Sequence, residues 1–230
     1  MTEINPDLAA LYPFLHGGHK DAARDNAGLL ESVRQKAADS VEVKRRFFEL
    51  HAQQVVDTAA AIARVYRGNG RMFSMGNGGS SCDAAHFAVE FLHPVTTGRP
   101  ALAVVNLVCD TAMMTAVGND VGFDHLFVRQ LIAHARKGDG LIGFSTSGNS
   151  ANLLSAFRRA RDMGVVTIGM AGGDGGAMAA GKDLDHCLTV ATDSIHRIQE
   201  THVATYHILW DLVHTLLADD RGHLQTGAHA

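Results

Sequence analysis

Two short segments of the chain consist almost entirely of Gly, Asn, Ser and Thr, residue types that commonly surround a phosphate. Residues 76–81 read Gly-Asn-Gly-Gly-Ser-Ser, and residues 145–150 read Ser-Thr-Ser-Gly-Asn-Ser. Glycines let the backbone approach a ligand, hydroxyls donate hydrogen bonds, and the N-terminus of a following helix offers free N–H groups. Neither segment has the lysine of a P-loop or the glycine spacing of a dinucleotide site. A phosphosugar fits these segments better than a nucleotide, although each alone could also serve only as a turn and helix cap.

A second set of residues could bind a metal or move protons. His86 and Glu90 stand four residues apart after the first segment, so they would share one face of a helix. An imidazole and a carboxylate one turn apart can hold a divalent metal, form a proton-transfer pair, or simply make a solvated contact. Gln199, Glu200 and His207 lie on a later helical stretch. On an ideal helix Glu200 is nearly in line with His207, whereas Gln199 is about 80° away, so spacing alone favours Glu200 as the partner of His207.

The elements that must position these residues alternate from residue 71 onward. Continuous apolar runs, typical of parallel strands covered on both faces, occupy residues 72–75, 101–105, 140–144, 165–170 and 186–190. Helical stretches occupy residues 81–92, 111–136, 151–163, 176–182 and 195–217. This alternation predicts an α/β fold with a five-stranded, flavodoxin-like parallel sheet and helices on both faces. Ligands bind outside the carboxyl ends of such strands, so the loops after the first three strands are the expected site.

The N-terminal part has a different character. Residues 1–68 contain no convincing strand, and apolar positions at residues 21–66 follow helical spacing over two predicted helices that end at Gly68-Asn69-Gly70. We expect residues 1–40 to form a partly helical N-terminal extension. Residues 41–220 would form a single α/β domain, and residues 221–230 a flexible tail.

Composition narrows the classes of function. The chain has 230 residues, with 20 Lys and Arg against 24 Asp and Glu, so no basic excess indicates a nucleic-acid partner. No apolar run of about 18 residues predicts a membrane span, and the N-terminus lacks the pattern of a signal peptide. Three widely spaced cysteines form neither a disulfide framework nor a zinc ribbon, which favours a reducing, cytoplasmic location. The 14 histidines raise the question of a metal or an acid–base site.

Taken in order, the motifs resemble those of the phosphoheptose isomerases, which are sugar-isomerase (SIS) domain proteins. The resemblance runs from about residue 40 to residue 218 and rests on Gly76-Asn-Gly-Gly-Ser80, His86-x-x-x-Glu90, Asp110-Thr, Val117-Gly-Asn-Asp120, Ser145-Thr-Ser-Gly-Asn-Ser150, Asp174-Gly-Gly176, Arg197-Ile-Gln-Glu200 and His207. It implies an SIS domain and a homotetramer with active sites at subunit contacts. It also implies conversion of sedoheptulose 7-phosphate to D-glycero-D-manno-heptose 7-phosphate through an enediol.

The resemblance further implies roles for individual residues. A zinc ion would be held by His86, Glu90, Gln199 and His207, which puts Gln199 rather than Glu200 at the metal. Glu90 and His207 correspond to the acid–base pair that moves a proton between C1 and C2. Residues that correspond to sugar-phosphate contacts are Asn77, Gly78, Gly79, Ser80, Asp110, Ser145, Thr146, Ser147, Ser150 and Gln199.

The chain departs from the family pattern at the rim of the expected pocket. Pro94, next to His93, stands where the family usually has an arginine, and His196 stands where Asp or Thr is common. These changes bear on the choice of sugar, so an isomerase of another ketose phosphate is an alternative. A second alternative is a non-catalytic SIS protein that binds phosphosugars or the bacterial replication initiator. The initiator-binding relatives lack the glutamate and the final histidine that this chain keeps as Glu90 and His207.

Overall fold

The structure is a computed structural model that describes residues 22–218. The chain divides into two compact units, residues 1–41 and 42–230, which we describe separately. The described part of the first unit is helical and exposes apolar side chains, among them Leu29, Leu30 and Val33. The expected tail at residues 221–230 and most of the predicted N-terminal extension lie outside the described residues.

One continuous helix, α2 (Ala22–Arg67), occupies the segment for which two helices are predicted. That prediction is wrong because neither Gly nor Pro occurs after Gly28 until the helix ends. Arg45 also ties adjacent turns together, with contacts of 2.7 Å to Glu42 and 2.6 Å to Glu49. The end of the helix is where the sequence predicts it. Asn69 adopts a left-handed conformation (φ 59°) and closes the last turn.

All five predicted strands are present, and they form one parallel sheet. The strands are β1 (Met72–Gly76), β2 (Val104–Asn106), β3 (Gly140–Ser145), β4 (Val166–Gly172) and β5 (His186–Val190). Their order is β2-β1-β3-β4-β5, which is the flavodoxin-like arrangement. The sheet confirms the predicted α/β fold.

The helices that follow the strands also agree with the sequence, with one exception. They are α3 (Gly79–Leu92), α4 (Thr111–Asp120), α5 (Leu126–His134), α6 (Ala151–Asp162), α7 (Gly176–Ala180) and α8 (Ile195–Leu216). The single helix predicted for residues 111–136 is wrong, because it is divided into α4, a short 3-10 turn at Phe123–His125 and α5. The break lies at Gly122, whose φ of 105° no helix allows.

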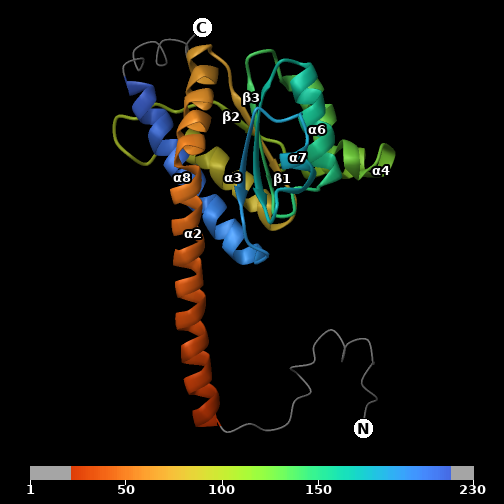
Figure 1. Cartoon of the computed structure of the whole chain (residues 1–230). Helices are drawn as coiled ribbons and strands as arrows, with labels where there is room; N and C mark the ends of the chain where they lie inside the picture. The colour runs from red at the N-terminus through yellow and green to blue at the C-terminus, as the bar shows by residue number, and fades with distance from the viewer. Residues whose placement is uncertain (1–21, 219–230) are drawn as a thin grey trace, which may run out of the picture. The chain divides into compact units, whose positions relative to one another are not determined.

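Helices cover both faces of the sheet, as Figure 1 shows for α6 and α7 on one side and α8 on the other. Alternate strand residues enter two apolar cores. Ile142 and Phe144 of β3 pack with α2, α3 and α8, whereas Leu141 packs with α5 and α6. Each strand residue is therefore covered whichever face it points to, which explains the continuous apolar runs. Within residues 22–218, no helix combines the length and the apolar character needed to cross a membrane.

Candidate functional site

The loops that follow β1 and β3 lie side by side where the strand order reverses. Gly76 at the end of β1 is paired with Phe144 near the end of β3. A reciprocal amide pair joins the loop after β1 to the loop after β3 through Asn152 in the first turn of α6. Asn77 Nδ2 donates to Asn152 Oδ1, and Asn152 Nδ2 donates to Asn77 Oδ1, each over 2.9 Å. The predicted contact residue Asn77 therefore also fastens the two loops together.

The loop after β3 presents its hydroxyls at the N-terminus of α6. Ser145 Oγ lies 2.9 Å from Ser150 Oγ, so the side chain of this N-cap residue does not cap the helix. Ser147 is exposed, and its Oγ accepts a hydrogen bond from the Asn149 N–H at 3.2 Å. Thr146 is half-buried between them. Hydroxyls therefore gather where the first-turn N–H groups of a helix can meet an anion, which favours a binding role over simple capping.

The loop after β1 depends on its glycines. Gly78 has a φ of 54°, a conformation that favours glycine. A Cβ added at Gly79 would collide with the side-chain amide of Gln199 on α8. Gln199 therefore lies directly over the glycine loop. Ser80, in the first turn of α3, is buried.

A cluster of possible metal ligands lies on α3 and α8. One ligand atom each from His86, Glu90 and His207 lies within 4.8 Å of the other two. His86 Nε2 is 3.0 Å from Glu90 Oε1, and the two imidazole rings are 5.0 Å apart between centroids. Two imidazoles and a carboxylate are a donor set that suits zinc. The residues present therefore fit the predicted metal.

Glu200 is not part of this cluster among the described residues, although helical spacing favours it as the partner of His207. Its carboxylate instead lies 2.9 Å from the Arg197 guanidinium on the preceding turn. The neighbouring Gln199 faces the glycine loop. The metal-ligand role that the family resemblance implies for Gln199 stays a prediction.

Asp110 follows β2 and begins α4. Its Oδ1 accepts a hydrogen bond from the Met113 N–H at 2.9 Å, so the residue acts as an N-cap. Among the described residues, Asp110 makes no hydrogen bond or ion pair with His86, Glu90 or His207. Its contact with the sugar stays a prediction. His93 and His196, at the departures from the family pattern, are both exposed.

Two buried groups that sequence reasoning missed lie beside the cluster. The Tyr206 hydroxyl is 2.6 Å from His86 Nδ1, and burial raises the pKa of Tyr206 well above its usual range, with Asp83 and Glu90 adding to the effect. Burial also raises the pKa of Asp83 to about 6, and His86 partly offsets this shift. Only its position in space reveals Tyr206, because it is 120 positions from His86 in the chain. Asp83 lies three residues before His86 on α3, so helical spacing could have found it.

The helix α8, which carries His207, is also fixed to α3 and to the segment that follows α3. Trp210 Nε1 donates to the backbone oxygen of Glu90 at 2.8 Å. Arg99 lies over the Trp210 ring at 4.3 Å from its centroid, and its guanidinium is 2.7 Å from the Asp211 carboxylate. These contacts hold the backbone of Glu90 against α8.

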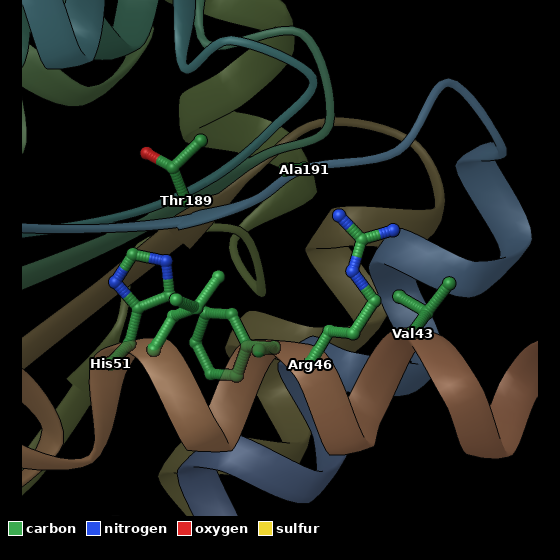
Figure 2. Close-up of a pocket in the computed structure, with 7 residues that line it drawn as sticks. Val43, Arg46, His51, Thr189 and Ala191 are labelled. Carbon is green, nitrogen blue, oxygen red and sulfur yellow. The ribbon is translucent and has the colours of Figure 1, made fainter.

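A separate pocket lies between α2 and the end of β5, as Figure 2 shows. Arg46 and His51 from the helix and Thr189 from the strand are among its lining residues. None of the residues that line it is a predicted site residue. This pocket is therefore distinct from the predicted site at the loops after β1 and β3.

The fold and this site define an SIS domain protein, and comparisons with known proteins agree. Residues 37–172 match the SIS domain family. A phosphoheptose isomerase from Desulfovibrio desulfuricans is 40% identical over 206 residues, which cover 89% of this chain and 97% of that protein. The solved phosphoheptose isomerase of Neisseria gonorrhoeae is 38% identical with a TM-score of 0.76, and the match covers 81% of this chain and 99% of that one. For the structure of the Francisella tularensis enzyme the identity is 32%, the TM-score 0.77 and the coverage 81% and 98%.

The chain therefore belongs to the phosphoheptose isomerase family. It is an enzyme of the isomerase class.

Proposed function

We propose that this enzyme is a phosphosugar aldose–ketose isomerase that converts sedoheptulose 7-phosphate to D-glycero-D-manno-heptose 7-phosphate. The observation that carries the proposal is the convergence of His86, Glu90 and His207 within 4.8 Å, on the helix that begins at the glycine loop and on the helix that packs against it. Its relatives of 38–40% identity carry the name phosphoheptose isomerase.

The sugar phosphate would bind across the two joined loops. Ser145, Thr146, Ser147 and Ser150 would donate to the phosphate together with the N-terminus of α6, where no side chain of the N-cap competes. The Asn77–Ser80 segment would approach the sugar through its backbone, and Asp110 would contact the sugar hydroxyls. Because Asn77 and Asn152 join the loops, the phosphate and the reacting carbons would be held at a fixed separation.

Glu90 and His207 would carry the proton transfers. Glu90 would remove a proton from C1 of the ketose, and the resulting enediol would take a proton back at C2. His207 would move a proton between the oxygens on C1 and C2, so that the carbonyl passes from C2 to C1. Trp210 donates to the backbone oxygen of Glu90, and this contact would help to hold the carboxylate in place for this step.

Zinc fits the donor set of His86, Glu90 and His207, and Gln199 would complete it. When bound, the metal would polarise the sugar carbonyl and stabilise charge on its oxygen. We expect about one zinc per chain in purified protein by elemental analysis. Protein that contains none, and that zinc does not activate, would remove the metal from this proposal.

We also propose a homotetramer in the cytoplasm. Leu50 and Val56 of the second unit are 73% and 46% exposed on α2, and contact with another subunit would cover such apolar side chains. Cys82, Cys109 and Cys187 are all free, as expected in a reducing compartment. Light scattering after size exclusion should give four times the chain mass, and a monomer would contradict the assembly.

An activity screen of the zinc-loaded protein against ketose and aldose phosphates of five to seven carbons tests the function. Sedoheptulose 7-phosphate should give the highest kcat/KM. Glu90→Gln and His207→Ala should abolish turnover in folded protein, whereas the surface variants Glu49→Gln and His134→Ala should retain it. Turnover of a different ketose phosphate alone would identify that sugar as the substrate in place of sedoheptulose 7-phosphate. No turnover at all would favour a non-catalytic binding protein.

A further inference from the structure

Tyr206 is a buried residue of α8 that contacts the metal cluster without belonging to it. It is 1% exposed. Its hydroxyl lies 2.6 Å from Nδ1 of His86, and its ring meets the His86 ring edge-on at 5.3 Å between centroids. Phe144 of β3 also packs edge-on against the Tyr206 ring, at 5.9 Å between centroids. The sheet therefore fixes the ring that contacts His86.

The two nitrogens of His86 have separate partners. Nε2 faces Glu90 Oε1 at 3.0 Å, and Nδ1 faces the Tyr206 hydroxyl. A neutral imidazole carries its proton on only one nitrogen, and a metal can bind only the nitrogen that carries none. The hydrogen bond at the second nitrogen therefore decides how readily the first can serve as a ligand.

A tyrosine hydroxyl suits this position because it can both donate and accept. When the Nε2–H donates to Glu90, the Tyr206 hydroxyl donates to Nδ1. When Nε2 offers its lone pair to a metal, the Nδ1–H donates to the Tyr206 oxygen. The ring of His86 therefore stays in one orientation while its proton changes place.

We propose that Tyr206 is a positioning residue of the metal site, whose hydroxyl holds the His86 ring so that Nε2 faces Glu90 and His207. The proposal rests on the proposed function only in treating this cluster as a metal site. It assigns a role to the residue directly before His207 in the chain. Tyr206 points into the core and His207 into the cluster, so one turn of α8 supplies both a ligand and the support of another ligand.

Tyr206→Phe tests the proposal because it removes the hydroxyl and keeps the ring that packs on Phe144. The matched control is Tyr66→Phe, which removes another buried tyrosine hydroxyl, one that lies 3.4 Å from the Ala103 backbone oxygen. Zinc alone is the probe, and its affinity is measured by competition with a chromophoric chelator. We expect Tyr206→Phe to bind zinc about 10- to 100-fold more weakly than the wild type, and Tyr66→Phe to bind it within twofold.

A second readout distinguishes positioning from simple loss of stability. In metal-free protein at pH 8, the ¹⁵N spectrum of His86 should show one tautomer in the wild type, with the proton on Nε2. Tyr206→Phe should keep this tautomer, because Glu90 still accepts from Nε2–H, but its Nδ1 signal should move to the position of an imidazole nitrogen that accepts no hydrogen bond. Tyr66→Phe should match the wild type. Zinc affinity of Tyr206→Phe within twofold of the wild type, an unchanged Nδ1 signal, or a wild type that binds no zinc would each overturn the proposal.

These outcomes are separate from those of the proposed function, because neither readout needs turnover. A protein that binds zinc through the Tyr206-supported site but isomerises no sugar phosphate would keep this inference and refute the proposed function. An active isomerase in which Tyr206→Phe changes neither readout would refute this inference and keep the proposed function.

Discussion

His202 of α8 is fully buried and uncharged, and we predict that it makes the fold sensitive to acid. Its Nε2–H donates to the backbone oxygen of Ala171 at 3.1 Å, at the carboxyl end of β4. Its Nδ1 is buried and has no hydrogen-bond partner among residues 22–218. Burial lowers the pKa of His202 from 6.5 to about 4, and the bond to Ala171 offsets this only in part. The same helix carries Gln199 and His207, so weakening it would affect the site.

The size of the effect follows from this pKa. Between pH 6.5 and 4 the unfolded chain binds a proton at His202 that the folded chain does not. Folding stability is therefore lost as the pH falls. With these two pKa values the loss is about 2 kcal/mol at pH 5 and about 3 kcal/mol at pH 4. Asp83 acts in the opposite direction because burial raises the pKa of its carboxyl to about 6, so the folded state binds that proton more readily.

Comparison with His202→Gln isolates the histidine. Glutamine keeps an N–H donor for Ala171 and does not titrate, while the contribution of Asp83 is common to both proteins. Urea unfolding of metal-free protein, at equal protomer concentration, should show the wild type losing about 2 kcal/mol relative to the variant between pH 7.5 and pH 5. A difference that changes by less than about 0.5 kcal/mol over this range would refute the reasoning, because it would mean that His202 titrates alike in both states.

Two further predictions concern the loops of the site. Asn152→Ala leaves the half-buried amide of Asn77 without its partner, so we expect a loss of about 1–3 kcal/mol in stability and a raised KM for the sugar phosphate. Urea unfolding and substrate titration check this, and an unchanged KM would show that the amide pair does not position the loops. Gly79→Ala puts a methyl group where the Gln199 amide lies, so zinc affinity should fall at least about tenfold. Gly28→Ala, where the added methyl meets open space, is the control, and equal zinc affinity in both variants would exclude Gln199 as a ligand.

The sequence predicted the sheet well because burial on both faces leaves a direct trace in it. Every residue of β3 is buried, which produces the continuous apolar run at residues 140–144. The points at which helices begin, end or break were harder to predict from the sequence. Helical spacing of apolar residues does not distinguish one long helix from two, and α2 remains continuous through contacts such as those of Arg45. The break at Gly122 depends on a backbone conformation that composition alone does not reveal.

Only part of the site could be predicted from the sequence, because tertiary packing brings the other residues together. His86 and Glu90 are one turn apart on one helix, so spacing alone brought them together. The choice between Gln199 and Glu200 depends on how α8 is rotated against the glycine loop, and tertiary packing sets that rotation. Asn152 and Tyr206 act through partners 75 and 120 residues away, which no local pattern connects.

The most direct test of the proposed function is a proton NMR measurement on sedoheptulose 7-phosphate in D₂O with zinc-loaded protein. Signals of an aldoheptose 7-phosphate should appear, with deuterium from solvent at C2, because Glu90 would move the proton through an enediol. Glu90→Gln should leave the spectrum of the ketose unchanged. A ketose spectrum that also stays unchanged with the zinc-loaded wild type would contradict the account.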